Sequence, residues 1–352
     1  MQYPIRIEKV AQSRVSQQPL TNLVFGKLFT DHLFIADFAD GKWGNCHIAP
    51  YGPIATSPSL YTMHYGQGIF EGMKAVLNAE GTPMMFRPLD NLQRLNYGAR
   101  RMALPEVPEE IFMNGLTQLL QLDKAWIPTE AGSALYIRPF LFATDSLIGI
   151  KPTEKFRFMI IATPVSKYYD KPVKILVADE YVRAFKGGTG DVKAIGNYGA
   201  TMLPMIEARQ KGYDQVLWMD GAEFKYAHEI GTMNFFVQIG DTFITPNIDG
   251  CILEGITRKS VIALLQDGGY TVEERPITID EIVDAADKGI LNDAFGTGTA
   301  ASLSHIELFG YEGRDLMVKP VTERTISTAI KNRLDNIKCG NEADKFNWVV
   351  PC

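Results

Sequence analysis

The sequence predicts a two-domain protein of the α/β (α+β) class. Its 352 residues exceed the length of a typical single domain. Strand-like and helical stretches alternate along the second half, and the segment "SKYYDKP" (166–172) is polar and ends in proline, as linkers often do. We therefore expect an N-terminal α/β domain at 1–165, a linker at 166–172 and a C-terminal α/β domain at 173–352.

The first half contains one early strand, two helices and two later strands. The strand is "LFIADF" (33–38), and the helices are predicted at 87–104 and 109–126. In the second helix, an apolar face is formed by residues that recur at helical spacing, namely Phe112, Leu116, Leu119 and Leu120. Two β-rich runs follow at 134–142 and 157–165, separated by a loop at 143–155.

The second half alternates more strictly between strands and helices. Strands are predicted at 173–178, 215–220, 233–240, 242–247 and 290–295, and helices at 200–212, 255–269 and 279–289. Gly268 and Gly269 end the second of these helices, and Thr278 with Glu281 gives the capping-box spacing that opens the third. The small residues of "FGTGTAAS" (295–302) predict a turn.

Composition and charge exclude several classes of protein. Hydrophobic residues make up 46% and charged residues 22%, which is typical of a folded enzyme. A net charge of −6 argues against nucleic-acid binding, and no apolar run approaches the length of a membrane span. The histidines and cysteines lack metal-site spacing, and the cysteines stand singly, as reduced thiols do. We expect a cytoplasmic protein with no metal, nucleic-acid or membrane partner.

Lys193 lies in the glycine-rich stretch "FKGGTGDVKAIGNYG" (185–199). A lysine in such a bend can hold a phosphate, or attack a carbonyl to form a Schiff base. The P-loop pattern fails, because Val192 precedes the lysine and Ala194 follows it, and no dinucleotide fingerprint follows a strand. Schiff-base chemistry therefore stands beside the simpler interpretation of a lysine next to a flexible loop.

Other segments offer groups that suit a cofactor with a phosphate and a pyridine-like ring. Glu229 precedes an apolar strand-like run, where a charge needs a cation or a hydrogen-bond donor. Residues 255–257 start a helix, whose N–H groups suit a phosphate, and the turn at 295–302 offers further amides. Arg87 and Arg94 lie in the first half, and Arg94 fits a bidentate phosphate clamp.

At these residues the sequence resembles the branched-chain amino acid aminotransferases, which are pyridoxal-phosphate enzymes of fold type IV. The resemblance runs in order from about residue 25 to the C-terminus, through "HYGQGIFEGMKA" (64–75), "FRPLDNLQRL" (86–95), "LYIRP" (135–139), "VKAIGNYG" (192–199), "HEIGTMNFFV" (228–237), "ILEGITRKS" (252–260) and "FGTGTA" (295–300). It implies a two-domain aminotransferase whose C-terminal domain binds pyridoxal 5'-phosphate. The implied reaction is transamination of leucine, isoleucine or valine with 2-oxoglutarate, giving branched-chain 2-oxo acids and L-glutamate.

The resemblance also implies a role for individual residues. Lys193 would bind the cofactor covalently and shuttle a proton, Glu229 would partner the pyridine nitrogen, and Tyr198 would bond the ring oxygen. The phosphate would be bound by Arg94, Ile256, Thr257 and Thr299. The amides of Thr299 and Ala300 would hold the substrate α-carboxylate.

The resemblance further implies a substrate pocket and a homodimer. The side-chain pocket would be lined by Phe25, Tyr65, Phe70 and Tyr136, with Arg138 meeting the distal carboxylate of glutamate or 2-oxoglutarate. The loop at 146–150, "SLIGI", is apolar for a loop, which fits the family habit of donating it to the neighbour's active site. Packing on its own domain is the alternative for this loop.

Three alternative functions stay open. Within the fold that the resemblance implies, D-amino acid aminotransferases and aminodeoxychorismate lyases share the lysine, the glutamate and the phosphate loops. A cofactor-free Schiff-base lyase or aldolase would use Lys193 directly, without need of Glu229 or a phosphate site. A non-catalytic phosphate-binding module is the third alternative, and it would be colourless, whereas a lysine-bound cofactor absorbs in the near-visible.

Overall fold

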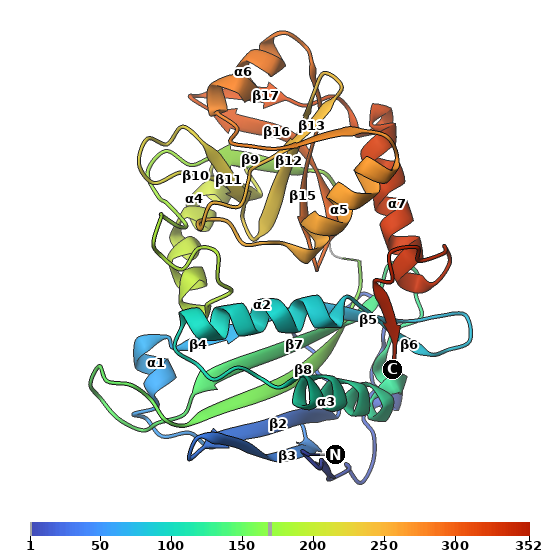
Figure 1. The fold of residues 1–352 in the computed structure, drawn as a ribbon. Helices are drawn as coiled ribbons and strands as arrows, with labels where there is room; N and C mark the ends of the chain where they lie inside the picture. The colour runs from blue at the N-terminus through green and yellow to red at the C-terminus, as the bar shows by residue number, and fades with distance from the viewer. Residues whose placement is uncertain (1, 168–170) are drawn as a thin grey trace. The chain divides into compact units, whose positions relative to one another are not determined.

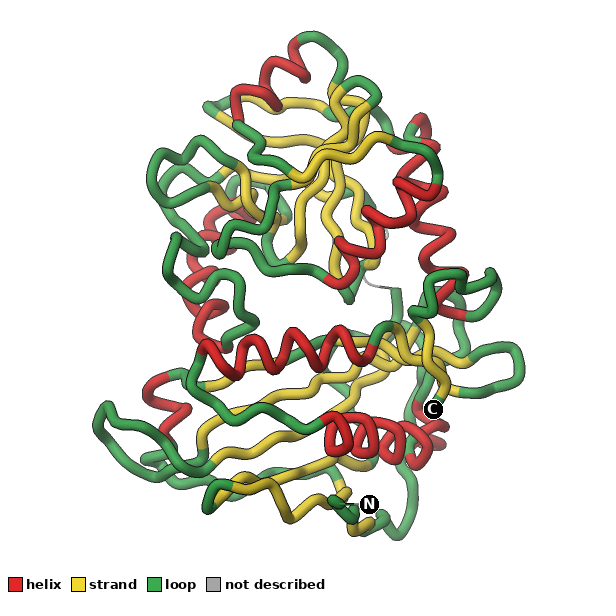
Figure 2. Tube along the Cα trace, in the orientation of Figure 1, coloured by secondary structure: helices red, strands yellow, loops and turns green. Residues whose placement is uncertain are grey.

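A computed structural model of the protein describes residues 2–167 and 171–352 (Figure 1). Two compact units are present, and helices and strands are mixed in both, which confirms the predicted α/β class (Figure 2). The first unit comprises residues 1–168, 192–196 and 336–352, and the second comprises 169–191 and 197–335. Within the predicted linker, residues 168–170 lie outside the described residues.

The described residues of the first unit form a nine-stranded sheet. Its strand order is β1-β3-β2-β8-β7-β5-β6-β18, and β4 pairs with β7. The strands are β1 (Arg6–Ile7), β2 (His32–Ala39), β3 (Lys42–Pro50), β4 (Gly68–Phe70), β5 (Met73–Leu77), β6 (Pro83–Phe86), β7 (Ala134–Ala143), β8 (Phe156–Val165) and β18 (Val349–Pro351). The strands predicted at 33–38, 134–142 and 157–165 are therefore confirmed as β2, β7 and β8.

Two long helices pack on this sheet, α2 (Pro88–Arg101) and α3 (Glu109–Leu122), and they contact each other (Figure 1). The predicted apolar face of α3 is confirmed, since its four residues are fully buried. The helix ends four residues earlier than predicted, and the remainder forms the 3-10 turn η2 (Lys124–Trp126). The shorter elements are η1 (Val15–Gln17) and α1 (Tyr61–Tyr65).

Side chains alternate between the two faces of β7, and this alternation positions part of the predicted site. Leu135 and Ile137 belong to the core that includes the helix residues, whereas Tyr136 packs in a separate small cluster. Because successive strand residues point to opposite faces, Tyr136 and Arg138 share the face that points away from that core. The motif "LYIRP" thus places one aromatic ring and one guanidinium side by side on the same face.

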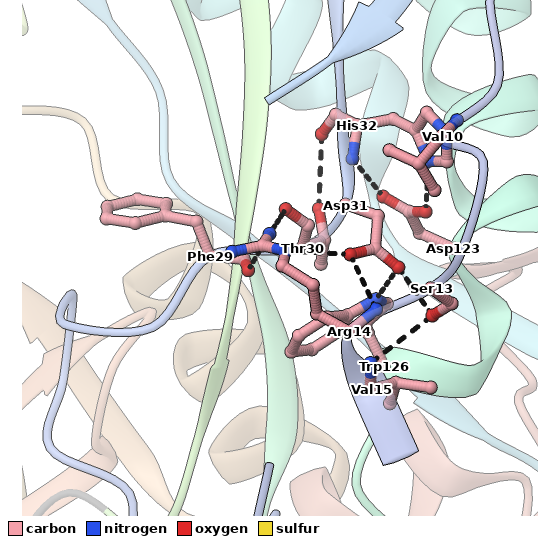
Figure 3. Close-up of polar contacts among 10 residues, drawn as sticks. All are labelled: Val10, Ser13, Arg14, Val15, Phe29, Thr30, Asp31, His32, Asp123 and Trp126. Carbon is pink, nitrogen blue, oxygen red and sulfur yellow. Dashed lines mark hydrogen bonds and ion pairs between the residues drawn. The ribbon is translucent and has the colours of Figure 1, made fainter. Parts of the chain in front are cut away.

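A buried carboxylate, Asp31, anchors the N-terminal segment to the first unit (Figure 3). Its oxygens accept hydrogen bonds from Ser13 Oγ at 2.5 Å, Trp126 Nε1 at 2.9 Å and Arg14 Nε at 3.0 Å. Burial by itself raises the pKa of the Asp31 carboxyl, but these hydrogen bonds outweigh burial and hold the pKa below its usual value. Asp31 therefore stays ionised and keeps three separate segments together.

The neighbouring His32 has a structural role that its hydrogen bonds define (Figure 3). Its Nδ1 lies 2.6 Å from Asp123 Oδ1, and its Nε2 accepts from the Val10 amide at 3.0 Å. Because Nε2 accepts, the proton of a neutral imidazole must sit on Nδ1 and be donated to Asp123. Both ring nitrogens are thus occupied by the fold.

The described residues of the second unit also form a nine-stranded sheet. Its order is β11-β10-β9-β16-β15-β12-β13-β14; β17 pairs with β16, and an additional pairing of β11 with β12 closes six of the strands into a ring. The strands are β9 (Val173–Val177), β10 (Gln215–Met219), β11 (Ala227–Ile230), β12 (Met233–Ile239), β13 (Thr242–Thr245), β14 (Thr271–Glu274), β15 (Leu291–Gly298), β16 (Ser302–Tyr311) and β17 (Arg314–Met317).

The three predicted helices of this half are confirmed as α4, α5 and α6, and the described residues add α7 and two 3-10 helices. They are η3 (Ile195–Thr201), α4 (Met202–Gln210), α5 (Ile256–Asp267), α6 (Ile279–Asp287), η4 (Val321–Glu323) and α7 (Thr325–Cys339), whose last residues belong to the first unit. The predicted cap of α6 is confirmed, because the Thr278 hydroxyl accepts from the Glu281 amide at 3.1 Å. None of the described helices is long and apolar enough to cross a membrane.

One turn begins later than the small residues of "FGTGTAAS" predict. β15 continues through Gly298, since Thr297 pairs with Asn234 on one side and with Leu303 on the other. Ladder pairing on both edges thus overrides the turn preference of the glycines. The turn itself is confined to 299–301.

Candidate functional site

The predicted site residues fall into two sets, one in each unit. The first unit holds Phe25, Tyr65, Phe70, Arg94, Tyr136, Arg138 and Lys193. The second unit holds Tyr198, Glu229, Ile256, Thr257, Thr299 and Ala300.

Lys193 belongs to a short segment that joins the core of the first unit. Its neighbours Val192 and Ala194 are each 2% exposed, and Ala194 forms a β-bridge with Ile69. The Lys193 carbonyl accepts from the Phe70 amide at 3.1 Å, and Nζ lies 4.9 Å from the centre of the Phe70 ring. Burial of both neighbours fixes the backbone from which the Lys193 side chain extends.

An aromatic wall with one arginine lies beside this lysine. The Arg138 guanidinium lies 4.5 Å from the ring centre of Phe70 and 5.3 Å from that of Tyr136, and Nη2 donates to the Tyr136 hydroxyl at 3.0 Å. Phe25 meets Tyr136 edge to face, with 4.9 Å between ring centres. A cation over aromatic faces is stabilised by their quadrupoles. Successive contacts thus link a continuous set of five residues: Phe25, Tyr136, Arg138, Phe70 and Lys193.

Gly72 is required for this arrangement. A Cβ atom at position 72 would lie 2.2 Å from the Tyr136 hydroxyl, much closer than non-bonded atoms approach. The absence of a side chain therefore lets Tyr136 reach the position in which Arg138 donates to it.

Tyr65 lies on α1 and contacts the apolar loop at 146–150. Its hydroxyl accepts from the Gly149 amide at 2.8 Å. Two further backbone links join the loop region to the start of α1: the Leu60–Ser146 bridge and the bond from the Tyr61 amide to the Asp145 carbonyl at 2.8 Å. The loop is therefore held beside α1, while Ile148 and Ile150 remain 67% and 90% exposed.

Arg94 forms an ion pair with Glu71 that sequence reasoning missed. Arg94 Nε donates to Glu71 Oε1 at 2.8 Å and Nη2 donates to Oε2 at 2.7 Å, so the contact is bidentate. Glu71 is fully buried, and the Arg94 side chain is 11% exposed. A guanidinium has five N–H donors and can serve more than one partner. The predicted contact of Arg94 with a phosphate stays a prediction.

Glu229 lies on β11 and is 4% exposed. The sequence indicated that this carboxylate needs a cation or a donor, and the structure provides both: Arg183 forms an ion pair with it, and Asn234 Nδ2 donates to Oε1 at 3.2 Å. Arg183 also donates to the carbonyls of Gly190, at 2.9 Å, and Cys251, at 2.6 Å. Arg183 and Asn234 thus supply the cation and the donor that a buried carboxylate needs.

His228, next to Glu229, stays neutral near pH 7. Burial lowers the pKa of its imidazole. The Asp249 carboxylate, whose Oδ2 lies 3.8 Å from Nε2, raises this pKa, but by less than burial lowers it. A neutral imidazole leaves the Glu229 charge to be balanced by Arg183.

The start of α5 fits an anion. The helix begins at Ile256 after Gly255, which caps it without a side chain, so the first N–H groups receive no side-chain bond from the cap. No acidic residue lies in the first turn, and Thr257 is 7% exposed. The preceding loop is held by Asn234, whose Nδ2 also donates to the Leu253 carbonyl at 2.8 Å.

Strand register gathers three predicted features at one end of the second sheet. Asn234 on β12 pairs with Glu229 on β11 and with Thr297 on β15. Thr299 and Ala300 follow directly in the turn after β15, and the loop before α5 is bonded to the same Asn234. Glu229, the start of α5 and the 299–301 turn therefore share one end of the sheet.

The residues after Lys193 return to the second unit through a local clamp. Thr189 Oγ1 donates to Asn197 Oδ1 and Asn197 Nδ2 donates to the Thr189 carbonyl, both at 2.7 Å. Tyr198 follows in η3, where its carbonyl accepts from Thr201 Oγ1 at 2.8 Å. The clamp closes the two ends of the Lys193 segment on each other.

The structure adds three residues to the candidate site: Glu71, Arg183 and Asn234. Glu71 and Asn234 lie inside apolar runs, "GIFEGM" and "MNFFV", where a polar side chain signals a buried partner. Arg183 lacks such a signal, because it stands in a mixed loop sequence. Its role follows from folding alone.

Comparisons with known proteins place this geometry in a family. A sequence model of the amino-transferase class IV family matches residues 68–302. Branched-chain-amino-acid aminotransferase 2 of Bacillus subtilis is 42% identical over 350 residues, which cover 98% of this chain and 96% of that protein.

Solved structures agree with that match. A branched-chain aminotransferase from Thermoproteus uzoniensis, solved with norvaline, superposes with a TM-score of 0.72 at 26% identity and covers 90% of this chain and 99% of its own. The PLP form of the Thermobaculum terrenum enzyme superposes at 0.73 with 21% identity, covering 90% and 97%, and so supports the fold.

We predict that Glu71→Ala destabilises the protein by about 3–5 kcal/mol, because it leaves the Arg94 charge buried without its carboxylate. Glu71→Gln, which keeps the volume, should cost less. The matched control is Glu106→Ala. It removes the half-exposed ion-pair partner of Arg100, which lies on α2 as Arg94 does, and it should cost about 1 kcal/mol or less. Urea unfolding measures all three, and equal losses for Glu71→Ala and Glu106→Ala would contradict the assignment.

Proposed function

This chain belongs to the class IV amino-transferase family, and from that premise we propose that it is a pyridoxal-phosphate-dependent branched-chain-amino-acid aminotransferase. It transfers the amine of leucine, isoleucine or valine to 2-oxoglutarate, giving branched-chain 2-oxo acids and L-glutamate. The observation that carries this substrate choice is the aromatic wall beside Lys193, which contains a single arginine. We also expect the protein to be cytoplasmic.

The residues present fit pyridoxal phosphate. The start of α5 offers N–H groups that no cap side chain occupies, which suits the phosphate. Glu229, which pairs with Arg183 and accepts a hydrogen bond from Asn234, suits a protonated ring nitrogen. Lys193, in a segment fixed by its buried neighbours, offers the amine that holds the aldehyde carbon.

The cofactor, when bound, supplies an electron sink for the charge that develops at the substrate Cα. Lys193 would hold the cofactor through its amine and would move the proton at the substrate Cα. Glu229 would keep a proton on the ring nitrogen, and the Tyr198 hydroxyl would bond the ring oxygen. The phosphate would be bound by Arg94, Ile256, Thr257 and Thr299, and the amides of Thr299 and Ala300 would hold the substrate α-carboxylate.

The aromatic wall serves two kinds of side chain. Aliphatic substrates bury methyl groups against Phe25, Phe70, Tyr65 and Tyr136, each methylene gaining about 0.8 kcal/mol. Glutamate needs a cation for its distal carboxylate, and Arg138 provides one. Arg138 Nε is buried with no hydrogen-bond partner, and among the described residues no carboxylate pairs with this side chain. A substrate carboxylate would supply the missing partner.

The loop at 146–150 is proposed to reach the neighbouring active site in a homodimer. Leu147 packs on its own core, but Ile148 and Ile150 are 67% and 90% exposed, and Met63 on the adjoining α1 is 68% exposed. Exposed apolar side chains gathered in this way favour burial against another subunit.

Lys193→Ala should abolish the near-visible absorbance of the purified protein and lower turnover on the order of a thousandfold or more, since one amine both holds the cofactor and moves the proton. Lys186→Ala is the control, because Lys186 is exposed in the same glycine-rich stretch. Absorbance spectra and leucine turnover test both variants. Wild-type turnover in Lys193→Ala would overturn the proposed reaction.

Arg138→Met should impair the half-reaction with glutamate far more than that with leucine, because only glutamate presents a distal carboxylate to this guanidinium. The control is Arg157→Met, on the next strand of the same sheet, where Asp37 already pairs with the arginine. Single-turnover rates for the two amino acids provide the comparison. Equal losses on both substrates would make Arg138 a structural residue.

The dimer proposal predicts complementation between two inactive variants. Lys193→Ala keeps the loop but loses the site, whereas the double variant Ile148→Asp, Ile150→Asp keeps the site but loses the loop. Unfolding and refolding them together in equal amounts should restore about a quarter of the sites, since half of the random dimers carry one complete site. No recovery in refolded mixtures that contain mixed dimers would show that the loop serves its own subunit.

A further inference from the structure

Asn234 makes two hydrogen bonds from one amide nitrogen, and they lead to two separate functional elements. Nδ2 donates to Glu229 Oε1 at 3.2 Å and to the Leu253 carbonyl at 2.8 Å. Glu229 is the proposed partner of the ring nitrogen, and Leu253 lies in the loop that leads into α5, the proposed phosphate site. Asn234 is 5% exposed, so neither bond competes with bulk water.

The other end of the same amide fixes the loop from a second side. A Cβ atom at Gly255 would lie 1.8 Å from Asn234 Oδ1, so the amide oxygen rests directly against the residue that caps α5. Gly255 has an ordinary φ of −70°, and glycine is therefore required there by space and not by backbone conformation. The amide of Asn234 thus touches the loop at both 253 and 255.

Arg183 makes a parallel connection. It pairs with Glu229 and donates to the Cys251 carbonyl at 2.6 Å, two residues before Leu253. Arg183 and Asn234 therefore each bind the Glu229 carboxylate and also the backbone of the loop at 251–255. Movement of the carboxylate and movement of the loop are coupled through these shared donors.

We propose that Asn234 is a positioning residue that sets the start of α5 and the Glu229 carboxylate in fixed relation, so that ring nitrogen and phosphate of the cofactor are bound together. The inference rests on the roles given above to Glu229 and α5. Loss of the amide removes one hydrogen bond from the carboxylate and one from the phosphate loop, and leaves Arg183 as their shared donor. A residue that served Glu229 alone would leave recognition of the phosphate unchanged.

The test compares pyridoxal phosphate with pyridoxal, which lacks the phosphate, in titrations of the cofactor-free protein. Asn234→Ala should raise the dissociation constant of pyridoxal phosphate about tenfold or more and that of pyridoxal only about threefold, because it loses a bond to each element. Asn234→Asp, which keeps the shape but cannot donate when ionised, should act in the same direction. It provides the test if the alanine variant fails to fold.

Two reference variants separate the two ends of the cofactor. Glu229→Gln should weaken both ligands by the same factor, since both contain the ring nitrogen. Thr257→Val should weaken pyridoxal phosphate alone. The matched control is Asn292→Ala, which removes a 2.8 Å bond from an asparagine on β15 to the Gly240 carbonyl and should change neither ligand.

The outcomes test the phosphate site at α5 and the coupling through Asn234 separately. If Thr257→Val weakens both ligands equally or neither, the phosphate site assigned to α5 is wrong, and with it that part of the proposed function. If Thr257→Val discriminates between the ligands but Asn234→Ala and Asn234→Asp do not, the phosphate site stands and the coupling through Asn234 is refuted.

Discussion

A carboxylate buried away from water must be paired, and this requirement organises both sets of site residues. Glu71 and Glu229 are almost fully buried, and each meets a guanidinium. An ionised carboxylate without such a partner would cost several kcal/mol in this environment. Glu71 therefore fixes Arg94 and the helix that carries it, while Glu229 fixes Arg183 and the loop that Arg183 binds. The pairs establish the positions from which the remaining groups act.

The second requirement is that backbone segments approach each other closely. The glycines around Lys193 differ in whether they meet it. At Gly190 a Cβ atom would lie 2.4 Å from the Cys251 carbonyl oxygen, so this glycine permits close packing. Gly187 has a φ of +83°, which favours glycine for its conformation, whereas Gly196 and Gly199 have open space around them. The stretch that suggested a flexible loop is therefore held firmly at some positions and open at others.

Sequence reasoning succeeded where the signal is local. Helical spacing predicted α3, and the Thr278 cap predicted the start of α6. The charge of Glu229 before an apolar strand indicated that this carboxylate has a buried partner. It could not name that partner, because Arg183 is far from Glu229 in the sequence and meets it only in the folded structure. The length of β15 was missed for a related reason: pairing on both edges stabilises a strand through glycines that in isolation favour a turn.

Arg94 and Arg138 show how surroundings assign different work to the same side chain. Arg94 is neutralised by a bidentate carboxylate, so its charge is already balanced before any ligand binds. Arg138 lies over the faces of Phe70 and Tyr136, and these cation–π contacts compensate for only part of the hydration that the guanidinium loses. Its Nε has no hydrogen-bond partner. An anionic substrate group therefore gains more from Arg138 than from Arg94. When the substrate is aliphatic, the same aromatic faces provide apolar contact, which lets one wall accept both partners of the reaction.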